Sequence, residues 1–599
     1  MTPIQYRITP QDLVGHRFIV ELTINTPHPE GQRVQLPAWI PGSYLIRDFS
    51  KQIENIEAFY TNNQGKKIPL ALTKVDSSTW DIAPSDQGVT VKLTAYAFDT
   101  SVRTAYLDQE RGFFNASSLC LKVSGQEALP CEISLISTSE TQDWEIQTSL
   151  PKLKVDKNGF GTYLVSSYDE LIDHPVALGQ FTKIKWLSYG IPHRMVIQGS
   201  LESVDRALLE RDLKILCETH IAFFDQKKKR APFKEYVFLV NAVGNGYGGL
   251  EHRSSTALLC SRSDLPYPQA KSPVAGNSQE LPNQAAYENF LGLCSHEYFH
   301  AWMIKKVQPK AFQPYELDRK NFTRLLWLFE GFTSYYDDLQ LFRSKRISKE
   351  KYLQRVLDNW NGVLRNPGRH KQSVADSSFD AWTKYYQADE NTPNAVVSYY
   401  AKGALVALGL DLLIRDFSHN HHSLDDIMHE IWKRHGAFGT HPGLGISEHG
   451  FGEIVIDVMG KSFTKPWKNF AKRYIDGKED LPLEELLQQQ GLTLKEKISP
   501  KKEALKAILG IRTVSSDGWV KITHVLDGGT AQKSGLAPGD LIASLNQERV
   551  TPARWDGLLD QVQQNALKMT IFRHDAQLEI SLSTKGGQAR QFELNPLKS

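Results

Sequence analysis

Apolar and polar residues alternate with a period of two over most of the first 175 residues, for example in the segments 18–24 and 91–98. Turn residues such as Asn62-Asn63-Gln64-Gly65 separate these segments. A period of two puts successive side chains on opposite faces of a strand. The pattern therefore predicts an antiparallel β domain.

The segment 36–49 interrupts this alternation. It contains Pro37, Pro41 and Gly42 among aromatic residues, which excludes a regular strand. We interpret the segment as a shaped loop that buttresses the β domain. The alternative interpretation is that it closes one wall of an active site.

After about residue 174 the period lengthens. A strand-like segment at 194–197 leads into a helical pattern from about 201 to 226, and an apolar run at 235–240 predicts a buried strand. A polar, Pro-rich segment at 261–283 predicts a loop that either overhangs a cleft or only connects two elements. Further helical patterns begin near residues 283 and 330 and continue from 401 to about 490.

The last hundred residues become strand-like again after a lysine-bearing linker at 498–502. At 599 residues, the chain is too long for a single hydrophobic core. We predict a multidomain α+β protein: an N-terminal antiparallel β domain over 1–174, a mainly α catalytic domain over 175–495, and a β-rich C-terminal domain over 496–590.

The helix predicted from residue 283 carries His296, Glu297 and His300 in a His-Glu-x-x-His pattern. Residues four apart share one face of a helix, so both imidazoles point toward the same place. Two imidazoles so placed can take two corners of a tetrahedral zinc site, and Glu297 can reach a water on that metal. The pattern is typical of a zinc hydrolase.

A third metal ligand is available at Glu330, in the middle of an apolar run. A carboxylate among apolar residues is costly to bury without a positive partner, and a metal ion would be that partner. Glu316 and Asp318 lie closer to the histidines, but in a polar stretch. We predict one Zn²⁺ per chain, held by His296, His300 and Glu330.

Asp337 follows Glu330 by seven residues, which places it on the same face of the next helix. Histidines that bind a metal usually donate their other ring nitrogen to a carboxylate or a carbonyl. Asp337 is therefore a candidate acceptor behind one of the two histidines. A solvent-exposed charge is the alternative.

Charge and cysteine usage exclude several classes of protein. The net charge of +2 comes from 70 basic and 68 acidic residues, so no broad basic field indicates a nucleic acid or an anionic membrane as partner. The five cysteines show no Cys-x-x-Cys spacing, which argues against a disulfide framework and fits a reducing compartment. Without a visible signal peptide or a long apolar run, we expect a cytoplasmic protein that does not span a membrane.

Two segments near the C-terminus resemble the PDZ family. Residues 508–511 (Ile-Leu-Gly-Ile) are similar to the PDZ loop whose backbone N–H groups bind a peptide carboxylate, and residues 534–540 (Ser-Gly-Leu-Ala-Pro-Gly-Asp) are similar to the family's short helix and turn. The resemblance covers about residues 500–585. It implies a PDZ domain that binds a peptide C-terminus as an added strand.

The His-Glu-x-x-His motif and the segment 327–336 (Trp-Leu-Phe-Glu-Gly-Phe-Thr-Ser-Tyr-Tyr) resemble the gluzincin metallopeptidases of the glycyl aminopeptidase family. The resemblance covers nearly the whole chain and implies an N-terminal β domain, a thermolysin-like catalytic domain and a C-terminal PDZ domain. The wider aminopeptidase and thermolysin patterns place the third ligand closer to the second histidine, whereas Glu330 lies thirty residues after His300. The family resemblance supports the longer spacing.

The resemblance also implies roles for other residues. Gly248, Gly249 and Glu251 match a strand that binds substrate in related aminopeptidases, where the glutamate pairs with the free α-ammonium group. Tyr400 matches the Tyr-x-Lys-Gly signature, which implies that its hydroxyl stabilises the oxyanion, although Tyr399 is adjacent. Glu297 would act first as general base and then as general acid.

Three functional hypotheses remain open. The leading one is a zinc aminopeptidase that acts on peptides and removes small N-terminal residues such as glycine or alanine; only the resemblance implies this size preference. The second is an endopeptidase or oligopeptidase that is guided by the PDZ domain. The third is a non-catalytic PDZ adaptor, and the complete set of motif residues argues against it.

Overall fold

The computed structural model describes residues 2–199, 204–267, 281–497, 499–563, 565–586 and 591–594. By its internal contacts the chain forms two compact units. Unit 1 comprises Met1–Asn321, Tyr336–Ile347 and Ile431–Ser447; unit 2 comprises Phe322–Tyr335, Ser348–Glu430 and Glu448–Ser599. Two helices, α5 (Gly331–Arg343) and α10 (Leu424–His435), contribute residues to both units. The boundaries expected after residues 174 and 495 stay predictions.

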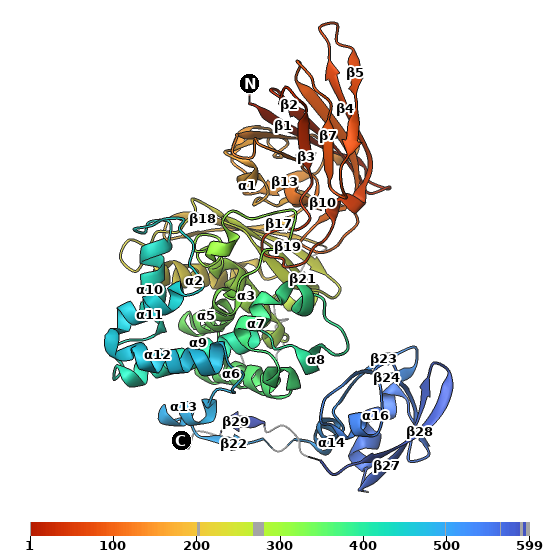
Figure 1. Cartoon of the computed structure of the whole chain (residues 1–599), viewed down its shortest axis with the longest axis vertical. Helices are drawn as coiled ribbons and strands as arrows, with labels where there is room; N and C mark the ends of the chain where they lie inside the picture. Colours follow the sequence, from red (N-terminus) through yellow and green to blue (C-terminus); the bar gives the residue numbers. More distant parts are fainter. Residues whose placement is uncertain are drawn as a thin grey trace, which may run out of the picture. The chain divides into compact units, whose positions relative to one another are not determined.

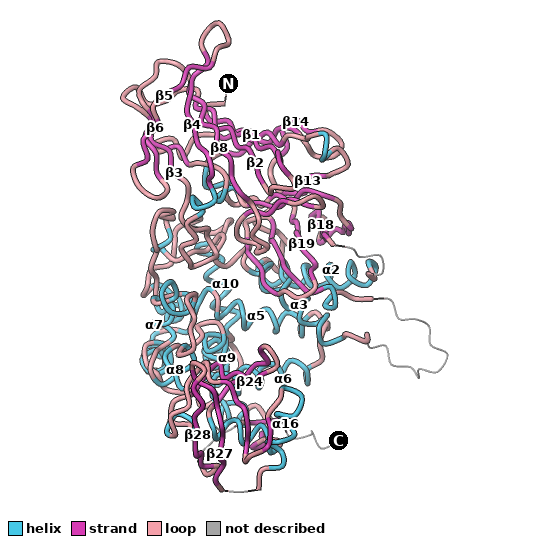
Figure 2. The backbone as a smooth tube through the Cα atoms, turned by 90° about the vertical axis from the view of Figure 1, so that its right-hand side faces the viewer, coloured by secondary structure: helices cyan, strands magenta, loops and turns pink. Residues whose placement is uncertain are grey.

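The N-terminal part of unit 1 consists of β-sheets, as the period of two predicts (Figures 1 and 2). In β2 (Arg17–Ile24) every second residue is buried, namely Phe18, Val20, Leu22 and Ile24. The pairs are antiparallel, except that β1 (Ile4–Asp12) runs parallel to β12 (Cys131–Leu135). The largest sheet has the order β14 (Lys152–Val155), β15 (Gly161–Val165), β12, β1, β2, β8 (Val89–Tyr96), β4 (Ile53–Thr61) and β5 (Lys67–Leu70).

Two smaller sheets complete this β region. One has the order β13 (Glu145–Thr148), β16 (Val176–Gly179), β10 (Arg111–Phe114) and β9 (Ala105–Leu107). The other has the order β11 (Lys122–Val123), β3 (Gln32–Gln35), β7 (Thr79–Ile82) and β6 (Leu72–Lys74).

A five-stranded mixed sheet follows in unit 1. Its order is β17 (Thr182–Ser188), β18 (Ile191–Gln198), β19 (Tyr236–Val243), β21 (Ser255–Ser261) and β20 (Tyr247–Glu251), so β20 is an edge strand. The central strands β18, β19 and β21 are parallel, and the first five residues of β19 are all buried, which matches the apolar run seen in the sequence.

Two long helices pack on this sheet. Helix α2 (Arg206–Phe224) begins after Asp205, whose side chain caps it by accepting from the Leu208 N–H. Helix α3 (Gln284–Phe299) contacts α2 and the strands β20 and β21. The central part of the loop expected at 261–283, residues 268–280, lies outside the described residues.

Unit 2 is helical up to residue 489, as the sequence predicts (Figure 1). Its helices are α4 (Leu326–Phe329), α6 (Lys349–Leu364), α7 (Val374–Phe379), α8 (Thr392–Ala395), α9 (Ala401–Phe417), α11 (Gly450–Met459), α12 (Thr464–Phe470) and α13 (Leu483–Gln489). Helix α9 is apolar on nearly every side and almost fully buried, which makes it the centre of this helical part.

The C-terminal part of unit 2 is a small β domain with its own core (Figure 1). The sheet has the order β23 (Ile511–Ser516), β24 (Trp519–Val525), β25 (Leu541–Leu545), β27 (Ala566–Arg573) and β28 (Ala576–Ser583), and β26 (Glu548–Arg549) pairs with β25. The domain also contains α14 (Lys501–Leu509), α15 (Thr530–Lys533) and α16 (Pro552–Gln561). Strand β23 is an edge strand and directly follows Gly510, which has a φ of +71°.

The chain beyond this domain returns to the helices. Strand β29 (Phe592–Leu594) pairs with β22 (Leu494–Glu496), which precedes the domain. The Phe592 ring stacks on Trp360 of α6 at 4.5 Å, and the Asn361 side chain bonds both the N–H and the carbonyl of Phe592. Strand β29 has only three residues, too few for an alternating pattern that would predict it from the sequence.

All five cysteines are buried and unpaired, as expected from their spacing. Among the described residues, no helix combines the length and the apolar character that crossing a membrane requires.

Candidate active site

Helix α3 is fixed from behind by two buried histidines. His193 Nε2 lies 2.8 Å from the Tyr298 hydroxyl, and His220 Nε2 lies 2.9 Å from Ser295 Oγ. Because the Ser295 hydroxyl donates to the carbonyl of Asp337, His220 is the donor in its contact. Helix α3 is therefore held both to the sheet and to helix α5.

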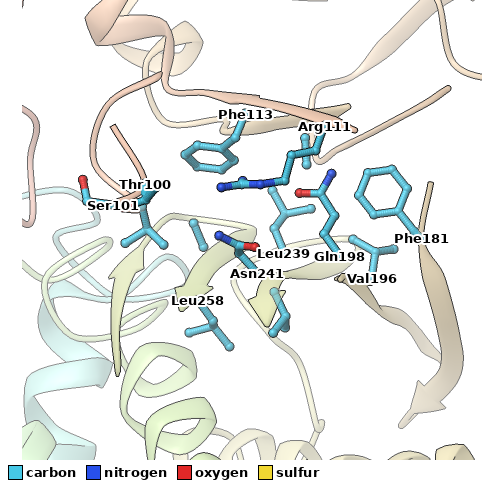
Figure 3. A pocket seen from close by; sticks show the side chains of 14 residues that line it. Thr100, Ser101, Arg111, Phe113, Phe181, Val196, Gln198, Leu239, Asn241 and Leu258 are labelled. Carbon is cyan, nitrogen blue, oxygen red and sulfur yellow. The ribbon is translucent and has the colours of Figure 1, made fainter. Parts of the chain in front are cut away.

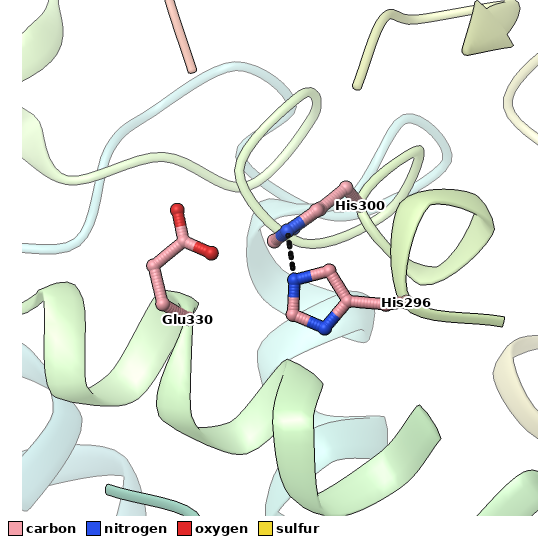
Figure 4. Close-up of side chains that lie close together, drawn as sticks. All are labelled: His296, His300 and Glu330. Carbon is pink, nitrogen blue, oxygen red and sulfur yellow. Dashed lines mark hydrogen bonds between the residues drawn. The ribbon is translucent and has the colours of Figure 1, made fainter. Parts of the chain in front are cut away.

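His296 and His300 project from the end of α3 toward Glu330 (Figure 4). One ligand atom from each of the three side chains lies within 4.8 Å of the other two. Glu330 directly precedes α5 and is 2 % exposed. The alternatives Glu316 and Asp318 lie beside Arg319, outside this cluster.

The two imidazoles face each other with their Nε2 atoms 3.2 Å apart (Figure 4). His296 Nδ1 lies 2.9 Å from Asp337 Oδ2, and His300 Nδ1 lies 3.1 Å from the carbonyl of Met303. Neither a carboxylate nor a carbonyl can donate, so each Nδ1 is assigned a ring proton, and in a neutral ring Nε2 then presents a lone pair.

Two lone pairs at this distance repel each other unless a cation lies between them. In a tetrahedral zinc site with Zn–N bonds of about 2.0–2.1 Å, two nitrogens are about 3.3 Å apart, so the observed spacing fits. The Glu330 carboxylate completes a donor set of two imidazoles and one oxygen. These three residues could hold a divalent metal ion, and Asp337 accepts from the ring nitrogen of His296 that faces away from this donor set.

A second cluster adjoins the first. Carboxylate oxygens of Glu251 and Glu297 and a ring nitrogen of His300 lie within 4.8 Å of one another. Both glutamates are buried, at 4 % and 5 % exposure, and Glu251 Oε1 has no hydrogen-bond partner among the described residues. Two carboxylates so close together in a buried place favour a positively charged ligand.

Backbone without side chains lies against both carboxylates. A Cβ on Gly249 would lie 2.2 Å from Glu297 Oε1, and a Cβ on Gly42 would lie 2.5 Å from Glu251 Oε1. Gly42 has a φ of +97°, which also requires glycine. The glycines therefore allow the close approach of main chain to both acids.

The loop that contains Gly42 packs against two distant segments. Trp39 is fully buried and its indole N–H donates to the carbonyl of Glu316 at 2.8 Å. Gly42 lies against the Glu251 carboxylate. Both interpretations, a buttress of the β domain and a wall of an active site, stay predictions. The prolines and the glycine predicted a shaped loop, but no local pattern in the sequence predicts that Gly42 lies against Glu251.

A buried group of charges lies behind Glu251. Lys305 Nζ lies 2.7 Å from Asp173 Oδ1, and the Arg253 N–H donates to Asp173 Oδ2 at 2.8 Å. Burial alone would raise the pKa of Asp173, but the charges of Lys305 and Arg253 hold this pKa well below its usual value. The Lys305 N–H donates to the carbonyl of His300, so the group connects the end of β20 with the turn after α3. The members of this group are far apart in the chain, so no local pattern in the sequence predicts it.

In unit 2 the two adjacent tyrosines have different surroundings. Tyr399 is fully buried and burial raises its pKa, as for a core residue. Tyr400 is half-buried, and its hydroxyl lies 3.2 Å from that of Tyr386, a residue that belongs to none of the sequence motifs. Of the pair, Tyr400 is the more exposed residue.

Glycines explain two of the sequence motifs. A Cβ on Gly331 would lie 2.6 Å from the Cα of Gly403 and 2.8 Å from the carbonyl oxygen of Tyr399. Helices α5 and α9 therefore touch main chain to main chain beside Glu330 and Tyr400. The glycine after Glu330 and the glycine that ends Tyr-x-Lys-Gly meet in this one contact.

A separate small cavity in unit 1 is lined by Arg111, Gln198 and Asn241 and by the segment 100–102 (Figure 3). Its volume of about 20 Å³ is enough for one water molecule. It does not include any of the predicted site residues.

Three family models match the chain. Residues 5–180 match the Peptidase M61 N-terminal domain, residues 289–406 match the M61 glycyl aminopeptidase, and residues 497–571 match the PDZ domain. The solved structure of an aminopeptidase N family protein from Idiomarina loihiensis is 37% identical, covers 99% of this chain and 98% of that chain, and has a TM-score of 0.89. The chain belongs to the M61 glycyl aminopeptidase family. It is a metallopeptidase with a C-terminal PDZ domain, which confirms the family prediction.

Other solved structures are more distant. An M1 zinc metallopeptidase from Deinococcus radiodurans with a bound Tyr-ser-ala substrate is 13% identical, covers 80% of this chain and 95% of that chain, and has a TM-score of 0.45. The yeast LTA4 hydrolase is 10% identical, covers 80% of this chain and 68% of that chain, and has a TM-score of 0.47. The search of curated proteins returned no match.

Changing Asp337 to asparagine should weaken metal binding about 10- to 100-fold, because the neutral amide oxygen accepts from His296 Nδ1 more weakly than the carboxylate and no longer raises the basicity of the ring. The measurement is a competition titration of Zn²⁺ against a chromophoric chelator. Asp358→Asn, on α6, is the control and should bind as the wild type does. Equal affinity of Asp337→Asn and wild type would contradict the role of Asp337.

The buried histidines predict a loss of stability in acid. Burial lowers the pKa of His193 to about 4 and that of His220 to about 3, below the ordinary value of about 6.5. Below pH 6.5 the unfolded chain binds protons that the folded chain does not, so stability is complete above that pH and falls as the pH drops toward 4.

Thermal unfolding at several pH values between 7.5 and 4.5 would measure this loss. His220→Gln, whose amide can still donate to Ser295, should show a shallower fall of Tm with pH. The exposed His422, changed to Gln, should leave the slope unchanged. Identical slopes for His220→Gln and wild type would rule out the contribution of His220.

Proposed function

We propose that this protein is a zinc-dependent aminopeptidase that hydrolyses the N-terminal peptide bond of peptides and prefers a small first residue such as glycine or alanine. The observation that carries the proposal is the adjacency of the two clusters: a His/His/Glu set suited to a metal, and two buried carboxylates beside it. One cluster suits bond cleavage, and the other suits recognition of an amine.

Zinc is the metal proposed, one ion per chain, with His296, His300 and Glu330 as its ligands. Two neutral imidazoles and one carboxylate are a common donor set for catalytic zinc. When bound, zinc supplies a Lewis acid and lowers the pKa of a water molecule to about 7. Asp337 and the Met303 carbonyl keep both rings in the tautomer that this requires.

Glu297 is the proposed general base. Its carboxylate takes the proton of the attacking water and then passes it to the leaving amine. The backbone at Gly249 lies against this carboxylate and limits its movement. The family resemblance assigns the oxyanion to Tyr400, whose hydroxyl would donate a hydrogen bond to the developing charge. The half-buried position of Tyr400, compared with the core position of Tyr399, supports this choice.

Glu251 is the proposed partner of the substrate α-ammonium group. An ammonium ion placed between Glu251 and Glu297 would relieve the repulsion of two buried carboxylates. When Glu251 binds the α-ammonium group, only one substrate residue lies between this group and the scissile bond. The enzyme therefore acts as an exopeptidase. The preference for a small first residue is what the family resemblance implies; the main chain at Gly42 lies directly against Glu251.

The PDZ domain offers a second peptide site. Strand β23 is an edge strand, and it follows Leu509 and Gly510 of the proposed carboxylate-binding loop. A peptide C-terminus could pair with the open edge of β23. The nearly neutral net charge favours neither nucleic acid nor an anionic membrane as a partner.

Replacing Glu297 with glutamine should lower kcat on alanine p-nitroanilide by about 10²- to 10⁴-fold, because the amide cannot accept the proton. Zinc content should stay at that of the wild type. Glu350→Gln, an exposed change on α6, is the matched control. Full activity of the Glu297→Gln protein would refute the mechanism, and less than about half an equivalent of zinc in the purified wild type would favour an adaptor role instead.

Blocking the substrate amine tests the role of Glu251. Wild-type enzyme should cleave Ala-Ala-Ala and fail to cleave its N-acetyl derivative, since the blocked amine has no charge to pair with Glu251. Glu251→Gln should raise KM for the free peptide at least about tenfold, the loss of one charge-assisted contact. Equal cleavage of blocked and free peptides by the wild type would indicate an endopeptidase.

A further inference from the structure

The loop between β8 and β9 carries Arg103 to the edge of the five-stranded sheet. This loop is anchored firmly: the buried Asn115 side chain donates to the carbonyl of Val102 at 3.0 Å, and the Asn115 N–H donates to the carbonyl of Thr104 at 3.0 Å. The segment 100–102 lines the small cavity in Figure 3. Arg103 is thus presented from a rigid loop.

The Arg103 guanidinium contacts β20. Its Nη2 donates to the carbonyl of Gly249 at 3.1 Å, and its Nη1 lies 3.9 Å from the position of a Cβ on Gly248. Its Nε is buried and has no hydrogen-bond partner among the described residues. A guanidinium has five N–H groups, so most of its donors remain available.

The positive charge of Arg103 is not neutralised by the described part of the protein. No described carboxylate lies within ion-pair distance of it, whereas Arg17 and Arg33 of the same β region each contact an aspartate or a glutamate. A half-buried arginine without an acidic partner, beside a substrate-binding strand, is suited to bind an anion.

The order of groups along β20 fixes where this anion would be. Glu251 is the proposed amine site, Gly249 lies against Glu297 where the bond is cleaved, and Arg103 lies against Gly249 and Gly248. A substrate that begins at Glu251 and extends back along β20 therefore reaches Arg103 on its leaving-group side. Glu251 and Gly249 are two residues apart on the strand, a spacing of about 7 Å, which is also about the length of two residues of an extended substrate.

We propose that Arg103 binds the α-carboxylate of short peptides, so that the preferred substrates are dipeptides and tripeptides with a free C-terminus. The inference rests on the proposed aminopeptidase function and adds the length and the charge of its substrate. The anchored loop, the unused donors and the distance along β20 all lead to the same substrate class.

The test compares each peptide with its C-terminal amide, which differs only in the negative charge. Wild-type enzyme should have a kcat/KM for Ala-Ala and Ala-Ala-Ala about tenfold or more above that for the amides, the value of one charge-assisted contact. Arg103→Gln should bring this acid-to-amide ratio close to one, and Arg103→Lys should retain part of it. Arg33→Gln, which removes another arginine of the β region, should keep the wild-type ratio.

The acid-to-amide ratio of kcat/KM distinguishes binding of the carboxylate by Arg103 from a structural role of Arg103. A general loss of activity or stability lowers both kcat/KM values equally and leaves their ratio unchanged. An unchanged ratio in Arg103→Gln, or a wild-type ratio near one, would overturn the proposal and leave the aminopeptidase function intact. Alanine p-nitroanilide has no carboxylate and serves as the separate readout. If the zinc-loaded wild type cleaved neither this substrate nor any of the peptides, the proposed function would fail and the role of Arg103 with it.

Discussion

Two imidazole lone pairs face each other across 3.2 Å, and much of unit 1 around helix α3 follows from that constraint. Two neutral rings in this arrangement repel each other unless a metal ion or a shared proton lies between them, so the fold must hold the rings in place. Asp337 and the Met303 carbonyl fix the proton on the far side of each ring. Behind them, His193 and His220 hydrogen-bond to Tyr298 and Ser295 of helix α3 and hold this helix in place. The position of the helix in turn determines the position of the two rings.

A second constraint is the main-chain contact between Gly331 and Gly403. No other residue would let α5 and α9 come so close, and this contact sets Glu330 next to the segment that carries Tyr400. The motifs at the start of these two helices therefore contain residues with two different roles. Glu330 and Tyr400 are suited to chemistry, whereas the glycines beside them determine how near the two helices lie.

The sequence was most informative where the site is local. His296, His300 and Glu297 lie within one turn of a helix, and their spacing alone predicts a shared face. Glu330 could be predicted because a carboxylate in an apolar run is costly to bury without a positively charged partner. The period of two and the period of 3.6 predicted the β region, the helical region and the C-terminal β domain, although not the parallel pairing of β1 with β12.

The residues that sequence did not reveal reach the site from distant parts of the chain. Gly42, Arg103 and Asp173 come from loops and turns of the β region, and each is defined by a contact more than 100 residues away. A turn residue shows by its type that the chain bends, but not what it will touch after folding. Such contacts depend on the register of whole sheets, which a single sequence does not display.

The pairing of β22 with β29 has a consequence for how such a protein can change. The chain leaves the helical part at β22 and comes back to the same ribbon at β29, so the two ends of the PDZ segment are neighbours. The PDZ segment is therefore inserted between two paired strands of the helical part. Joining β22 directly to β29 would remove the PDZ segment and keep the ribbon that packs on α6, whereas a truncation placed just before Phe592 would remove β29 and leave the PDZ segment attached.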